Sequence, residues 1–108
     1  MDPIDLEEMI RNDKKDIVCR LGTVLTLKNS SFPYPPGRDF DIILSDIENI
    51  RVESICTRRD TGVEGGRSHY IEKITFQKPG QYKIKIKELG SGKNEGGYKF
   101  YFVDVIVV

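Results

Sequence analysis

The chain contains no tryptophan, one histidine and two cysteines among its 108 residues. The histidine, His69, has no serine, cysteine or carboxylate at the spacing of a catalytic triad, and general-base schemes need such an orienting partner. Cys19 and Cys56 have no Cys or His neighbour at the spacing of metal ligands, which argues against a zinc site. These absences predict that the protein is not an enzyme and binds no metal.

Recognisable cofactor motifs are also missing. The acidic residues between positions 39 and 48 lack the glycine-containing alternation of a calcium loop. The glycines at 62–66 and 90–97 are not followed by Lys-Ser/Thr and a helix, as a phosphate-binding loop requires. We therefore predict no cofactor.

Excess charge and long apolar runs are absent as well. The 17 basic and 17 acidic side chains balance, so no long-range field favours a polyanion and nucleic acid is not an expected partner. No window approaches the roughly 18 apolar residues of a membrane span. The first eight residues are acidic, whereas a secretory signal is basic and then apolar. We expect a soluble protein with no membrane partner, and the pattern does not exclude a leader removed by processing.

The first dozen residues predict a short helix. Asp2 can cap free backbone N–H groups and Pro3 fits the first helical position. Leu6, Met9 and Ile10 share one helical face. We accordingly divide the chain into an N-terminal helical arm, residues 1–15, and a β-sandwich domain, residues 16–108.

From Asp16 onward, apolar residues recur at every second position between clusters of Gly, Pro, Ser and Asn, which is typical of strands and turns. About seven strands are expected. They lie near residues 16–21, 23–28, 38–44, 49–57, 69–77, 81–88 and 98–108. This number and spacing predict an all-β chain, an immunoglobulin-like two-sheet antiparallel sandwich.

Two expected strands have distinctive faces. In 81–88, three lysines alternate with apolar residues, which predicts one buried face and one face of solvated lysines, with an anion-binding stripe as the alternative. The strand at 98–108 is apolar on both faces, so we expect the rest of the sandwich to cover it. Asp104 interrupts that run, and we expect either a bulge that turns it outward or a charge that opposes aggregation.

Both cysteines fall at positions that alternate with polar residues. Cys19 and Cys56 are therefore predicted to be buried, and without a visible signal peptide we favour reduced thiols. A disulfide between them is the alternative, because sequence does not fix the distance between their Cα atoms.

Three long connections interrupt the strand pattern, at residues 29–37, 58–67 and 89–97. Because successive strands reverse direction, the loops after the second, fourth and sixth strands should emerge at the same end and form one surface. Phe32 and Tyr34 lie among prolines in the first connection and suit an interface anchor. The alternative is that these aromatic residues fold back over the core.

The C-terminal half carries a resemblance to a known family. GVEGG at 62–66, HY at 69–70, FQKPGQYKI at 76–84 and the apolar strand after Phe100 resemble the chagasin-type inhibitors of papain-like cysteine peptidases. That family consists of immunoglobulin-like sandwiches that place three loops in and around a peptidase cleft. The chain lacks the family's Asn-Pro-Thr-Thr-Gly stretch in the first loop and its Arg-Pro-Trp in the third.

The pattern and the resemblance together predict a protein-binding β-sandwich that inhibits papain-like cysteine peptidases with three loops at one end. The residues predicted to contact the partner are Phe32, Pro33, Tyr34, Gly62, Gly65, Gly66, Gly92 and Lys93. The alternative is a structural or accessory module that binds a protein through a sheet face or edge.

Overall fold

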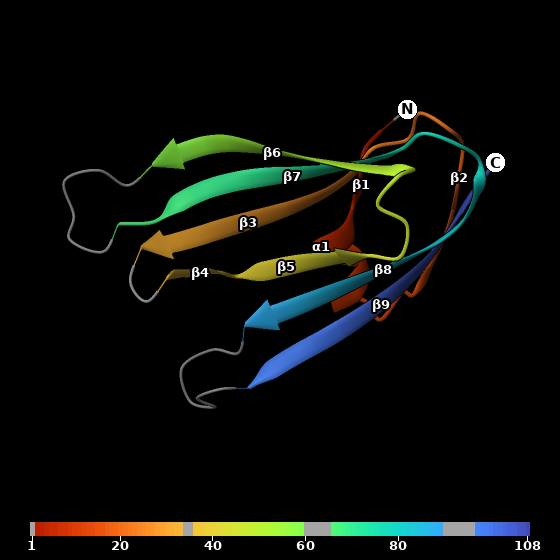
Figure 1. The fold of residues 1–108 in the computed structure, drawn as a ribbon. Coiled ribbons are helices and arrows are strands. Elements are labelled where there is room, and N and C mark those ends of the chain that lie inside the picture. The colour runs from red at the N-terminus through yellow and green to blue at the C-terminus, as the bar shows by residue number, and fades with distance from the viewer. Residues whose placement is uncertain (1, 34–35, 60–65, 90–96) are drawn as a thin grey trace.

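The computed structural model describes residues 2–33, 36–59, 66–89 and 97–108, and within them it forms two β-sheets and one helix (Figure 1). The first sheet has the strand order β1-β3-β7-β6, with β4 also paired to β3. Its strands are β1 (Ile4–Asp5), β3 (Leu25–Pro33), β4 (Pro36–Arg38), β6 (Ile50–Arg59) and β7 (Ser68–Phe76). The second sheet has the order β2-β9-β8-β5. It contains β2 (Asp16–Cys19), β5 (Phe40–Leu44), β8 (Gly80–Leu89) and β9 (Tyr98–Val107).

This architecture confirms the predicted all-β immunoglobulin-like sandwich. All seven expected strands are present, and most pairs are antiparallel. Two pairs differ, because β1 runs parallel to β3 and β2 runs parallel to β9. Parallel neighbours need a crossover rather than a hairpin. The short strands β1 and β2 meet this condition. After each of them the chain crosses to the other sheet before it returns to form the partner strand, β3 or β9.

The helix α1 (Leu6–Arg11) begins later than the sequence suggests. Asp5, not Asp2, is its N-cap, because Asp5 Oδ1 accepts hydrogen bonds from the backbone N–H groups of Glu7 (2.9 Å) and Glu8 (3.4 Å). The predicted apolar face is confirmed: Leu6, Met9 and Ile10 are all buried. They join the core of the sandwich, while the boundary drawn at residue 15 stays a prediction.

The core lies between the sheets and is formed by alternate residues of their inner faces. Its least exposed members come from α1 and from β3, β7, β8 and β9. They are Leu6, Leu25, Leu27, Ile74, Ile84, Ile86, Val103 and Val105. Burying a side chain of this size contributes about 1.5–3 kcal/mol to the free energy of folding. In the described part of the chain, α1 has six residues, and no helix is long and apolar enough to cross a membrane.

The first predicted connection is shorter than expected, because β3 continues through it to Pro33. Ser31, Phe32 and Pro33 pair with Arg38, Gly37 and Pro36 of β4. Phe32 and Pro33 therefore lie in a strand and not in a loop. The sequence concealed this strand because its inward residue at this point, Asn29, is polar.

The lysine strand has the predicted faces, and the last strand does not. On β8, Tyr82, Ile84 and Ile86 are buried and the lysines point outward. On β9, the face that carries Phe100 and Phe102 is open, with Phe102 61% exposed. The expectation of a covered strand was wrong, because only the inner face of each sheet in a two-layer sandwich meets the other sheet.

Asp104 lies on the open face of β9 by ordinary alternation. It stands opposite Lys83 in an unbroken β8–β9 register. The predicted bulge is therefore absent at Asp104, and the carboxylate reaches solvent without one.

The cysteine prediction holds for one residue only. Cys19 is buried in β2, whereas Cys56 is exposed on β6, and both are free. Burial of Cys56 was wrong because β6 is an edge strand and Ile50 is the only one of its residues that is buried in the core. The alternative of a disulfide between the two is likewise not realised.

Candidate functional site

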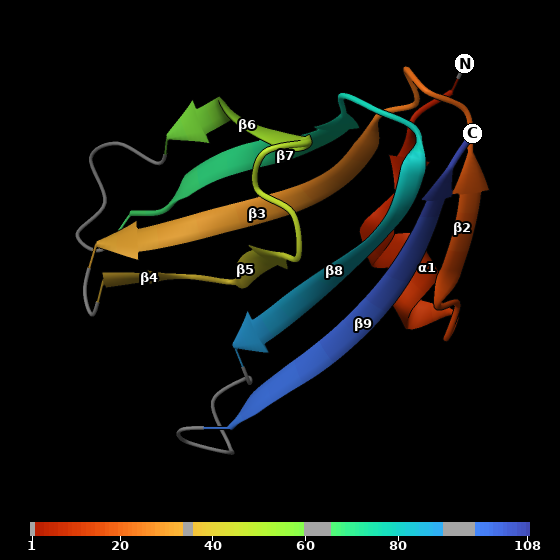
Figure 2. The ribbon, with the colours of Figure 1, turned by 45° about the vertical axis from the view of Figure 1, so that its right-hand side comes forward.

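The strand ends that flank the three connections lie at one end of the molecule, opposite both termini (Figures 1 and 2). They are the ends of β3 and β4, of β6 and β7, and of β8 and β9. We call the described residues at these strand ends the rim. The residues that form it are Phe32, Gly37, Arg38, Arg58, Arg59, Gly66, Arg67, Ser68, Leu89 and Tyr98.

Three of the predicted contact residues are described, namely Phe32, Pro33 and Gly66. The other five lie outside the described residues. These are Tyr34, Gly62, Gly65, Gly92 and Lys93.

Phe32 is half-buried on the rim. Its ring lies against Gly37, where an added Cβ would come within 2.8 Å of Phe32 Cε2. The Arg67 guanidinium carbon stands 5.3 Å from the ring centroid, at a distance typical of a cation–π contact. Gly37 thus provides the space for the ring, and Arg67, which follows the predicted contact Gly66, lies over it.

Four arginines gather on the rim, and the sequence reasoning did not single them out. They are Arg38, Arg58, Arg59 and Arg67. Arg67 Nη1 lies 3.6 Å from Asp39 Oδ1 and Arg38 Nη1 lies 3.8 Å from Glu72 Oε1. The sequence signal that could have found them was their position, because Arg38 directly follows the first connection and Arg58, Arg59 and Arg67 stand at the two ends of the second. Arginine and aromatic side chains are enriched among residues that dominate protein–protein binding energy.

The buried side chain of Glu72 helps to hold Arg38 in position on the rim. It is 2% exposed, on the inward face of β7, and its Oε2 accepts a hydrogen bond from Ser54 Oγ. A buried carboxylate needs a compensating charge, and Arg38 supplies it from β4. The guanidinium carbon of Arg38 also lies 5.9 Å from the centroid of the Tyr70 ring. Glu72 and Tyr70 therefore both hold this guanidinium, at the end of the sandwich where the rim lies.

Tyr70 stands beside this arginine. The hydrogen bond from Ser31 Oγ to Tyr70 Oη (3.5 Å) stabilises the phenolate and lowers the pKa of Tyr70 below its usual value. The nearby positive charge of Arg59 acts in the same direction.

The structure brings Ser30 and His69 together, which the sequence spacing concealed. Ser30 Oγ lies 3.2 Å from His69 Nδ1, and Arg58 Nη2 lies 3.0 Å from His69 Nε2. Guanidinium has no acceptor, so Nε2 must accept from Arg58 and the ring proton sits on Nδ1. Nδ1 then donates to Ser30 Oγ. The imidazole of His69 is thus held between Ser30 on β3 and Arg58 on β6.

A hollow of about 310 Å³ lies between the two sheets at the rim. It is lined by Phe32, Gly37, Arg38, Asp41, Lys87, Leu89 and Tyr98. Lys87 Nζ lies 3.8 Å from the Tyr98 ring centroid, so a cation covers an aromatic ring on this side as well. Among the described residues, no group of three His, Cys, Asp or Glu side chains could hold a metal ion.

Comparison with known proteins gives a result for the fold alone. No protein-family model matches the chain, and no curated protein sequence does either. The solution structure of amebosin superposes with a TM-score of 0.56 at 17% identity, over 98% of this chain and 96% of that one. The cysteine protease inhibitor EhICP2 from Entamoeba histolytica gives 0.54 at 11% identity, over 98% and 94%. PbICP-C in complex with falcipain-2 gives 0.49 at 14%, over 100% and 91%.

This protein has the fold of the chagasin-type cysteine protease inhibitors. The likeness extends along nearly the whole of both chains in the amebosin and EhICP2 comparisons. The resemblance read from the C-terminal half of the sequence is therefore confirmed for the fold of the entire chain.

Proposed function

We propose that this protein binds another protein through its rim and inhibits a papain-like cysteine peptidase by covering the active-site cleft. The observation that carries the proposal is that the strand ends flanking all three connections meet at one end of the sandwich. The shared fold with EhICP2, a cysteine protease inhibitor, supports the choice of partner.

The proposed contacts come from all three connections. They are Phe32, Pro33 and Tyr34 in the first, Gly62, Gly65 and Gly66 in the second, and Gly92 and Lys93 in the third. Glycine suits this role, because a backbone without a Cβ can approach a cleft wall closely. Phe32 would add apolar contact area at little entropic cost, since Gly37 and Arg67 already restrict its ring.

Titration of papain with the purified protein tests the proposal. We expect loss of hydrolysis of a fluorogenic peptide substrate at micromolar or lower inhibitor concentration, with competitive kinetics because the cleft is blocked. Undiminished papain activity at such concentrations would contradict peptidase inhibition.

A variant series then tests the rim itself. Phe32→Ala removes the ring and is expected to raise the inhibition constant about tenfold, equivalent to about 1.4 kcal/mol. Ile47→Ala is the matched control, since Ile47 is 80% exposed and lies outside the rim. Thermal unfolding of both variants separates lost contact from lost folding. An equal inhibition constant for the two variants would argue against binding through Phe32.

A further inference from the structure

One edge of β9 is only partly covered. β2 pairs with Asp104–Val107 and begins at Asp16, opposite Asp104. The described residues 98–103 of β9 have β8 on one side and no paired strand on the other. An open edge of this kind presents unpaired backbone donors and acceptors to any extended chain that approaches it.

The hydrogen bonds of β9 show which groups face that edge. The N–H of Asp104 donates to Lys15 O (2.8 Å) and the N–H of Val108 donates to Cys19 O (2.9 Å), both away from β8. Because orientation alternates along an antiparallel ladder, Phe100 and Phe102 direct their N–H and C=O groups to the same side. Within the described residues, no backbone hydrogen bond is recorded for either residue on this side.

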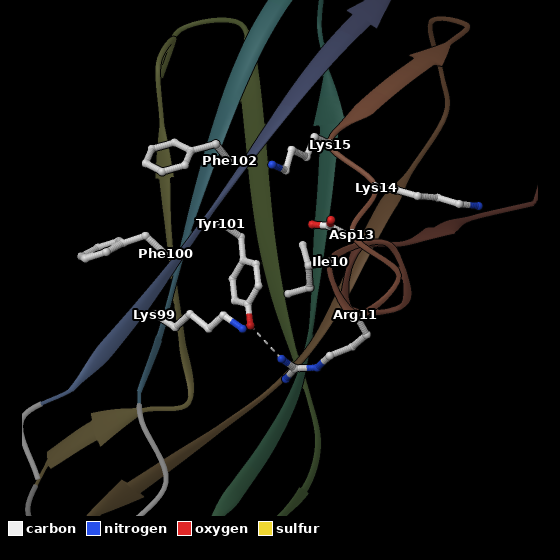
Figure 3. A pocket seen from close by; sticks show the side chains of 9 residues that line it. All are labelled: Ile10, Arg11, Asp13, Lys14, Lys15, Lys99, Phe100, Tyr101 and Phe102. Carbon is white, nitrogen blue, oxygen red and sulfur yellow. Dashed lines mark hydrogen bonds between the residues drawn. The ribbon is translucent and has the colours of Figure 1, made fainter. Parts of the chain in front are cut away.

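A groove of about 490 Å³ runs along this open edge (Figure 3). It lies between β9 and the segment from Ile10 to Lys15, which leads from α1 to β2. Five residues of β9, from 98 to 102, span about 16 Å at the usual rise of a strand. The groove therefore suits a short extended segment placed in line with β2 and beside β9.

The side chains around the groove determine what that segment should carry. Lys99 and Tyr101 lie on the face of β9 that is turned toward α1, and they alternate with residues on the outer face. Figure 3 shows the side chains of Lys15 and Lys99 extended toward the groove. Asp13 is the only acidic side chain among the described residues of the lining, and Lys14, which also belongs to the lining, points away from β9 in Figure 3. Arg11 is already bound to Glu88, which leaves the two lysines to attract negative charge.

The other side of the edge is apolar. Phe100 and Phe102 are 45% and 61% exposed on the outer face of the second sheet. Lys85 Nζ lies 4.4 Å from the Phe100 ring centroid and 5.6 Å from that of Phe102, so one cation covers part of both rings. Neighbouring residues of an added strand would point to opposite faces, which selects a segment whose acidic and apolar side chains alternate.

We propose that the open edge of β9 binds an extended acidic segment of a partner protein by strand addition. Backbone hydrogen bonds to Phe100 and Phe102 would provide the pairing, acidic side chains would meet Lys15 and Lys99, and apolar ones would cover the phenylalanine rings. A second copy of this chain is a poor occupant, because edge-to-edge pairing would bring the same lysines together. The site lies along the side of the sandwich and does not depend on peptidase inhibition.

The test uses a synthetic peptide in which glutamate alternates with valine, titrated into ¹⁵N-labelled protein. We expect shifts of the amide signals of Phe100 and Phe102, with those of their β8-facing neighbours Lys99 and Tyr101 moving less. A peptide N-methylated on the amides that face β9 has the same charge and should bind at least tenfold more weakly. A peptide alternating lysine with valine should show no comparable shifts.

Variants of the groove complete the test. The double variant Lys15→Glu with Lys99→Glu should bind the glutamate peptide at least tenfold more weakly. Lys83→Glu, on β8 away from the groove, should change the affinity for this peptide little. Phe102→Pro removes one edge N–H and should abolish binding, whereas Phe102→Ala keeps that N–H, loses only the ring and should weaken binding less. The amide spectrum of each variant checks that it is folded. Absence of shifts at Phe100 and Phe102, or equal binding of the N-methylated peptide, would overturn the proposal. Self-association of the free protein that buries these two amides would overturn it in favour of a second copy.

Discussion

Asn29 on β3 and Phe40 on β5 join the two sheets through a pair of hydrogen bonds. Asn29 Nδ2 donates to Phe40 O at 2.9 Å, and Phe40 N–H donates to Asn29 Oδ1 at 3.0 Å. Both residues are about 5% exposed. The side-chain amide thus pairs with a backbone peptide as a strand would, at the point where the chain leaves β4 in the first sheet for β5 in the second.

Replacement of this asparagine tests the bridge. Asn29→Ala leaves a buried N–H and a buried C=O of Phe40 without partners, and each such loss costs about 1–3 kcal/mol. We expect the free energy of unfolding in urea to fall by about 2–4 kcal/mol. Asn12→Ala, at an exposed asparagine, is the control and should cost about 0.5 kcal/mol or less. Similar losses for both variants would show that the bridge adds little.

Acidification should weaken the tie between α1 and the second sheet. Arg11 donates to both carboxylate oxygens of Glu88, and Tyr101 Oη donates to one of them. The bond from Arg11 lowers the pKa of Glu88. A carboxyl whose pKa is lower in the folded state stabilises that state above its unfolded pKa, and the contribution is lost as pH falls through the folded pKa.

We therefore expect the unfolding free energy to fall as pH drops below the ordinary glutamate pKa of 4.5, with a contribution from Glu88 of about 1 kcal/mol, kept small because Arg11 is 46% exposed. Denaturant titrations of Glu88→Gln across this range should show a shallower pH dependence than the parent. Glu53→Gln, on the exposed face of β6, is the matched control. An unchanged slope in Glu88→Gln would contradict the assignment.

The end of α1 offers a stabilising substitution. Asp13 has a positive φ of 58°, and the turn is closed by the bonds from Asp13 N–H to Ile10 O (3.3 Å) and from Lys14 N–H to Met9 O (2.9 Å). Glycine adopts this left-handed conformation without the strain that a Cβ causes. Asp13→Gly should raise the unfolding free energy by about 0.5–1 kcal/mol, measured by thermal denaturation. Asp13→Ala should give no gain, since alanine retains the strained Cβ.

The two thiols should differ in reactivity. Cys56 is exposed on the edge strand, whereas Cys19 is buried and burial raises the pKa of its thiol. A thiol reagent such as a disulfide-exchange chromophore should therefore label one cysteine rapidly in the folded protein and the second only after denaturation. In Cys56→Ser the rapid phase should disappear, and in Cys19→Ser it should persist. Two rapid phases of equal rate would contradict the burial of Cys19.

Local sequence was informative wherever one face of a strand meets the core and the other meets water. The alternation of Tyr82, Ile84 and Ile86 with lysines fixed the faces of β8, and the helical face of α1 was equally clear. The resemblance in the C-terminal half pointed to the correct fold. The predicted contact residues of the rim stay a prediction, because most of them lie outside the described residues.

Other features depended on contacts between residues distant in the chain. The meeting of Ser30 with His69 follows from the β3–β7 register, and no local pattern specifies which residues of two strands stand opposite each other. Likewise, nothing in the composition of β9 shows that β2 covers only its last residues.

By itself, the sequence determined most of the strands, the apolar face of α1 and the fold class, because periodic burial is encoded residue by residue along each strand. Only the tertiary structure decided which apolar faces stay open, which strand edge lacks a neighbour and which polar residues, such as Asn29 and Glu72, are buried. The physical reason is that burial and hydrogen bonding depend on what packs opposite a residue, and that partner is supplied by another part of the chain.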